Sequence, residues 1–224
     1  LQDLKLSKNQ INDLSPLVGL SNLQDLKLSK NQINDLSPLV GLTNLHQLIL
    51  EYNQISDISP LAGLTNLQGM TLSSNRISDL SPLADLINLR QLGLYDNQIS
   101  DISPLAWLTN LQGLAINNNH ISNLSPLAGL TNMQGMHLEY NQISDISPLA
   151  CLSNLQGLYL DNNPISYESM LLSQSWTLPW STNEYNPLSP CYPVPNRNAA
   201  NVSTGSYLSW QGNYDNSQDV FYEV

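Results

Sequence analysis

Eight consecutive copies of a 22-residue repeat make up most of this 224-residue chain and constrain its fold more than any other feature. The copies begin at Leu1, Leu23, Leu45, Leu67, Leu89, Leu111, Met133 and Leu155. Counted from these residues, the consensus is L-x-x-L-x-L-x-x-N-x-I-x-x-[LI]-S-P-L-x-x-L-[ST]-N. A unit this short cannot bury its own apolar side chains, so the copies must stack into a solenoid with one continuous core.

Each repeat contains two different apolar periods. Leu4 and Leu6 alternate with polar residues, which indicates a half-buried strand. Positions 11, 14, 17 and 20 recur every third residue, which fits turns and 3₁₀-helix better than α-helix. The Ser-Pro pair at positions 15 and 16 can start such a helix, with Ser as the cap. We therefore predict a solenoid of the α/β class, with a parallel sheet on the concave side and 3₁₀ turns on the convex side.

The repeat pattern also sets the expected domain boundaries. We assign residues 1–166 to the repeats, with the eighth copy incomplete, and residues 167–195 to a C-terminal cap and linker. Residues 196–224 resemble the start of a fibronectin III or Ig-like β-sandwich, which needs about seven strands and is expected to be poorly ordered when truncated. No cap precedes Leu1, so we expect the apolar residues of the first repeat to face solvent. Both ends suggest a piece of a longer protein.

Two polar columns are expected to support the fold. An Asn at position 9 lies where each strand turns the corner, and its amide can satisfy backbone groups of its own turn and of the neighbouring repeat. This structural column is Asn9, Asn31, Asn53, Asn75, Asn97, Asn119, Asn141 and Asn163. The carboxylates at position 13 precede the Ser-Pro turns and are expected to cap them. Weak calcium binding between neighbouring carboxylates is the alternative. This second column is Asp13, Asp35, Asp57, Asp79, Asp101 and Asp145, interrupted by Asn123.

The side chains at positions 5, 7 and 8 should point out from the concave sheet. All four Lys residues of the chain lie in the first two repeats, while acids and Tyr follow, so we expect a basic N-terminal end and an acidic, aromatic surface beyond it. Tyr beside carboxylates is typical of protein-recognition surfaces. We predict partner contacts from Ile49, Glu51, Tyr52, Tyr95, Asp96, His137, Glu139, Tyr140, Tyr159 and Asp161.

Composition excludes several other functions. The net charge of −11 argues against nucleic-acid binding, and no apolar run is long enough to span a bilayer. Glu139 and Asp161 are stacked neighbours, but an open sheet offers no deep pocket for catalysis. We predict no enzyme activity, no cofactor and no specific metal site. Cys151 and Cys191 are either joined in a disulfide or two free thiols.

The repeat resembles the 22-residue class of leucine-rich repeats found in bacterial internalins. The resemblance covers residues 1 to about 165 and implies a non-enzymatic module whose concave face binds a protein, in an extracellular or cell-surface bacterial protein. An intracellular scaffold or phosphatase regulator of the same repeat class is the alternative, and a carbohydrate-binding face is a further one. The sequence does not determine the oligomeric state.

Overall fold

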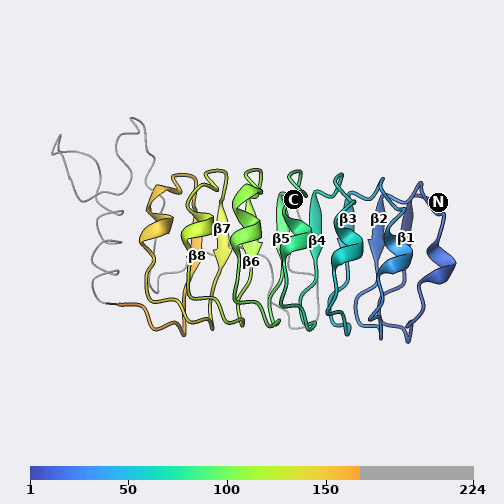
Figure 1. Cartoon of the computed structure of the whole chain (residues 1–224), viewed down its shortest axis with the longest axis horizontal. Coiled ribbons are helices and arrows are strands. Elements are labelled where there is room, and N and C mark those ends of the chain that lie inside the picture. The colour runs from blue at the N-terminus through green and yellow to red at the C-terminus, as the bar shows by residue number, and fades with distance from the viewer. Residues whose placement is uncertain (167–224) are drawn as a thin grey trace.

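A computed structural model describes residues 1–166, which form a single regular solenoid (Figure 1). One three-residue strand comes from each repeat, and the eight strands pair in parallel and in chain order. They are β1 (Asp3–Lys5), β2 (Asp25–Lys27), β3 (Gln47–Ile49), β4 (Gly69–Thr71), β5 (Gln91–Gly93), β6 (Gly113–Ala115), β7 (Gly135–His137) and β8 (Gly157–Tyr159). The predicted parallel sheet is confirmed.

Short 3₁₀ helices alternate with the strands and form the opposite side of the solenoid. They are η1 (Ser15–Leu17), η2 (Ser37–Leu39), η3 (Ser59–Leu61), η4 (Ser81–Leu83), η5 (Ser103–Trp107), η6 (Ser125–Leu127) and η7 (Ser147–Cys151). The three-residue apolar period therefore did indicate 3₁₀ structure, and residues 1–166 contain no α-helix. None of the helices in this part of the chain has the length and hydropathy required to cross a bilayer.

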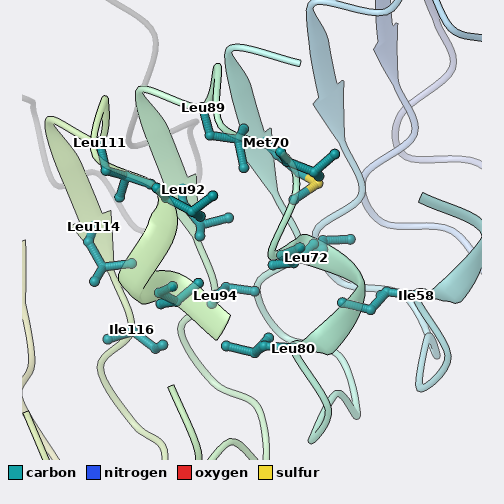
Figure 2. Close-up of a cluster of buried hydrophobic side chains, with 14 of the residues drawn as sticks. Ile58, Met70, Leu72, Leu80, Leu89, Leu92, Leu94, Leu111, Leu114 and Ile116 are labelled. Atoms are coloured by element: carbon teal, nitrogen blue, oxygen red, sulfur yellow. The ribbon is translucent and has the colours of Figure 1, made fainter. Parts of the chain in front are cut away.

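Strand register brings equivalent repeat positions side by side. Leu4 pairs with Leu26, and every later strand keeps the same alignment. The apolar positions therefore stack in columns and form one continuous core, in which most side chains from Leu23 to Met136 are at most 1% exposed. Figure 2 shows two such columns, formed by Met70, Leu92 and Leu114 at position 4 and by Leu72, Leu94 and Ile116 at position 6.

The asparagine at position 9 links each repeat to the one before it. The Asn97 amide nitrogen donates to the carbonyl oxygens of Leu94, in its own turn, and Leu72, in the preceding repeat, at 3.1 and 3.2 Å. Its side-chain oxygen accepts the Ile77 backbone N–H at 3.0 Å. The pattern recurs from Asn31 to Asn163, so these residues tie each turn to the preceding repeat, whereas Asn9 donates only within its own turn.

The side chain at position 13 accepts the first backbone N–H of each 3₁₀ helix. Asp101 accepts the Ser103 backbone N–H at 2.8 Å and the Ser103 hydroxyl at 2.9 Å. Asn123 accepts the Ser125 N–H in the same way, so the amide preserves the backbone bond. The capping prediction is confirmed for this column. The idea that Ser itself caps is wrong, because Ser is the first helical residue and donates to the Asp.

The N-terminal end of the core is only partly covered. Leu1 is 69% exposed, as expected, whereas Leu4, Leu6 and Ile11 are half-buried because they pack against the second repeat. The cap and linker proposed for residues 167–195 and the β-sandwich segment proposed for 196–224 lie outside the described residues.

Candidate functional site

The sheet face, which is the concave face of the solenoid, has a floor of small or covered side chains in its middle. The whole face is formed by the outward-pointing residues at repeat positions 3, 5, 7 and 8. Thr71 and Ala115 at position 5 are 2% and 3% exposed, and Gly93 lies between them. A Cβ added at Gly93 would come within 3.1 Å of the Thr71 Cβ, so the neighbouring strands pack closely here.

Two residues of the predicted contact set belong to this floor. Ile49 is 1% exposed and Glu51 is 6% exposed, so these two offer almost no area for the partner contact predicted for them. The Thr71 hydroxyl donates to the Glu51 carboxylate at 2.6 Å and helps to hold it against the sheet. The physical reason is the close stacking of parallel strands, about 4.8 Å apart, which lets neighbouring side chains cover one another.

The N-terminal end of the face carries both signs of charge rather than a basic surface. Strand alternation places Asp3 and Asp25 on the same face as Lys5 and Lys27, a consequence of the two-residue period that the sequence argument overlooked. Burial raises the pKa of the Asp25 carboxyl, and the neighbouring Asp3 raises it further. The expected basic end is therefore partly neutralised on the sheet itself.

Tyr52 and Tyr95 form a bridge in the middle of the face, although they are two repeats apart. Their hydroxyl oxygens are 3.4 Å apart, and Tyr95 donates to Tyr52. Burial raises the pKa of the Tyr95 hydroxyl well above its ordinary value, and the bond with Tyr52 and the charge of Glu51 add to the shift. The Lys30 ammonium lies 5.1 Å from the centroid of the Tyr52 ring, within reach of a cation–π contact. This part of the face is held in place by its own contacts.

The residues at position 8 form a ridge in which every backbone φ is positive. We call this column the left-handed ridge; its φ values lie between 52° and 61°. Its members are Lys8, Lys30, Tyr52, Ser74, Asp96, Asn118, Tyr140 and Asn162. Asn and Asp tolerate this conformation, whereas it is strained for an aromatic residue. Tyr52 and Tyr140 nevertheless occupy it with 45% and 59% of their surface exposed.

A cluster of aromatic and acidic side chains lies over repeats 7 and 8. We call His137, Glu139, Tyr140, Tyr159 and Asp161 the histidine cluster. The His137 and Tyr159 rings stack with centroids 4.3 Å apart and planes within 7°. The His137 Nδ1 atom is 3.1 Å from Glu139 Oε1. Glu139 Oε2 is buried and no described group hydrogen-bonds to it.

Two of the predicted contact residues are solvent-accessible carboxylates. Asp96 and Asp161 are exposed, and Asp96 accepts a hydrogen bond from the Asn118 amide at 2.9 Å. The structure thus brings Tyr52 and Tyr95 together in the middle of the face, and His137 together with Glu139 and Tyr159 further along. Within residues 1–166, no group of three or more His, Cys, Asp or Glu side chains is arranged to hold a metal ion.

One exposed apolar site escaped the sequence argument. Trp107 is 71% exposed at position 19, where four other repeats have Gly, and Ile87 is 52% exposed at position 21. Trp107 departs from the Gly of those four repeats and Ile87 from the Ser or Thr of the consensus, and these departures were the signal available in the sequence. Cys151, also at position 19, is disulfide-bonded, while Cys191 lies outside the described residues.

Comparison with known proteins accounts for this architecture. The family described as leucine-rich repeats (two copies) matches residues 1–41, 21–63, 65–107 and 131–171. Internalin C2 of Listeria monocytogenes is 45% identical, with a TM-score of 0.68 over 74% of this chain and 71% of that one. The chain is an internalin-like leucine-rich repeat protein. Leucine-rich repeat domains of this kind are generally protein-binding and non-enzymatic, which confirms the prediction that the domain is not an enzyme.

Other solved structures extend the likeness. An internalin (inlF) of Listeria monocytogenes is 37% identical, with a TM-score of 0.63 over 76% of this chain and 57% of that one. A leucine-rich repeat protein of Leptospira interrogans is 30% identical, with a TM-score of 0.74 over 78% of this chain and 46% of that one. A search of curated proteins found no match. The internalin-like repeat is thus shared with bacterial proteins, two of them considerably longer than the matched region.

Proposed function

We propose that this internalin-like domain recognises a protein partner through its concave face. The observation that carries the proposal is the left-handed ridge, where Tyr52 and Tyr140 are exposed in a backbone conformation that Asn118 and Asn162 adopt at lower cost. Stability alone does not favour Tyr at these places, whereas Tyr contributes a large contact area with little loss of conformational entropy in an interface.

We further propose that the domain acts outside the cell or on its surface. The disulfide bond at Cys151 supports this location, because disulfides persist in oxidising compartments and are rare in reducing ones. The similarity to internalins supports it as well. We propose Cys191 as the bonding partner of Cys151, and a comparison of reduced and non-reduced peptide masses tests that pairing.

The decisive experiment screens the full chain against an array of purified extracellular proteins. The test variant combines Tyr52→Asn, Tyr95→Asn and Tyr140→Asn, since repeat 6 already has Asn117 and Asn118 at the same two positions. We expect its binding signal to fall at least tenfold, in line with the large share of interface energy that buried Tyr residues carry.

The matched control is Trp107→Gly, which introduces on the convex side the Gly that four other repeats have at this position. We expect this variant to bind as the wild type does. Loss of binding in the Trp107 variant, combined with unchanged binding in the Tyr variant, would move the interface to the convex side.

A further inference from the structure

We infer that the histidine cluster is a receptor for an arginine side chain presented by the protein partner. This inference rests on the proposed function and makes it more specific. It names one location on the concave face and one chemical group that the partner must bring there.

The first argument is the unsatisfied carboxylate oxygen of Glu139. Oε1 lies beside His137 Nδ1, but Oε2 is buried without a hydrogen-bond partner among the described residues. A buried acceptor in this state costs free energy, and a donor arriving from a partner removes that cost. A charged donor forms the stronger bond.

The second argument is the charge of the surrounding face. From repeat 3 onwards, positions 5, 7 and 8 carry four carboxylates and neither Lys nor Arg. These carboxylates are Glu51, Asp96, Glu139 and Asp161. The acidic charge is not balanced within these columns, unlike at the N-terminal end, where Lys5 and Lys27 accompany Asp3 and Asp25. A cationic group on the partner is the complement of this surface.

The third argument concerns shape. His137 stacks on Tyr159, and its register neighbour on the other side is Ala115, followed by Gly93. Ala115 and Gly93 have no ring or long side chain that could itself cover the face of the His137 ring away from Tyr159. A planar guanidinium can stack on an aromatic face while it donates to a carboxylate, which an ammonium cannot match. We therefore assign arginine rather than lysine.

The three parts of the face thus differ in whether their charged and polar groups find partners within the domain. Charges alternate at the N-terminal end, and the Tyr52–Tyr95 bridge is closed by its own hydrogen bond and covered by Lys30. Buried side-chain atoms of Ser29, Ser73, Ser74 and Gln91 on the rest of the face also lack a partner among the described residues, but these residues are neutral. The histidine cluster instead keeps a carboxylate oxygen without a donor, together with Tyr140, which is largely exposed. This contrast selects the cluster as the place where a partner side chain is bound.

The test is a selection of phage-displayed random linear peptides on the full chain at low ionic strength. Enriched peptides are synthesised, and their affinities are measured for the wild type, Glu139→Gln, Tyr52→Asn and the convex-side control Trp107→Gly. Glu139→Gln keeps the shape of the side chain and removes its charge, while Tyr52→Asn alters the face outside the cluster. Thermal unfolding verifies that both variants are folded, and Asp161→Asn serves as a second cluster variant.

We expect the enriched peptides to share an arginine whose replacement by citrulline, or by lysine, weakens binding. Glu139→Gln should weaken binding by about tenfold or more, as for the loss of one charge-assisted hydrogen bond, and Tyr52→Asn should weaken it less. Trp107→Gly, on the convex side, should leave it unchanged. Peptides without arginine, equal binding to Glu139→Gln, or no enrichment at all would overturn the inference. Peptides that respond only to Tyr52→Asn would overturn it too, while leaving the proposed concave interface in place.

Discussion

Repeat positions 8 and 9 form two neighbouring columns of the solenoid, and they differ in how strictly the fold specifies the side chain. Position 9 is Asn in all eight repeats, and its amide bonds to two repeats at once. Position 8 has the same positive φ in all eight repeats, yet it holds Lys, Tyr, Ser, Asp and Asn. The fold thus fixes the backbone at both positions but specifies the side chain at only one of them. Side-chain freedom at position 8 is therefore available for recognition.

The largest expected effect comes from breaking the position 9 column in the interior. Asn97→Ala leaves the Ile77 N–H and the Leu72 and Leu94 carbonyls without this partner in a buried setting. We expect a loss of about 3 kcal/mol in the free energy of unfolding, measured by urea denaturation.

The control for this change is Asn9→Ala in the first repeat. Asn9 is exposed and donates only within its own turn, so its loss should cost less than about 1 kcal/mol. Equal losses at Asn9 and Asn97 would show that bonds between repeats contribute nothing.

A smaller effect is expected at the caps of the convex side. Asp101→Ala removes the acceptor for the Ser103 N–H and should lower the free energy of unfolding by about 1 kcal/mol. Asp101→Asn should lose less, because Asn123 already caps Ser125. Calorimetry of the two variants measures the difference, and identical unfolding would contradict the capping role.

The caps also predict a dependence of stability on pH. Hydrogen bonds from the backbone and the hydroxyl of the following serine lower the pKa of Asp13 and Asp57. Their contribution is therefore present above the ordinary aspartate pKa and is lost as the pH falls through the lowered value. Replacing both by Asn should make the unfolding midpoint less sensitive to acid.

The left-handed ridge predicts opposite effects on stability and on binding. Tyr140→Asn should increase the free energy of unfolding by about 0.5–1 kcal/mol, because Asn tolerates positive φ better than Tyr. The same variant should bind the partner more weakly. Asn118→Tyr is the reciprocal change and should destabilise by a similar amount. A destabilised Tyr140→Asn variant would show that the ring contributes to folding.

The smallest effect concerns the paired acids on the first two strands. Asp25→Asn removes the repulsion from Asp3 and should stabilise the fold by about 0.3 kcal/mol at neutral pH. Burial and Asp3 raise the pKa of Asp25, so in the wild type stability falls as the pH rises through the ordinary aspartate range towards that raised pKa. The variant should lack this part of the pH dependence, and unchanged titration would contradict the coupling.

The sequence by itself determined the repeat length, the parallel sheet, the 3₁₀ turns, the Asn column and the Asp caps. These features follow from local hydrogen bonding and from apolar periods that are repeated in every copy, so a single consensus contains them. The Asn97 bonds to both its own and the preceding repeat are an example, since any solenoid of this period brings those groups together.

Only the tertiary structure decided which outward residues are accessible. Ile49 and Glu51 share columns with exposed residues, yet neighbouring strands cover them, while Tyr52 reaches across a whole repeat to Tyr95. The two carboxylate oxygens of Glu139 also differ, since Oε1 lies beside His137 Nδ1 and Oε2 is buried without a hydrogen-bond partner among the described residues. No spacing in the sequence encodes this difference. The physical reason is that exposure depends on the sizes of side chains in adjacent repeats, which are far apart in the sequence and come together only when the repeats stack.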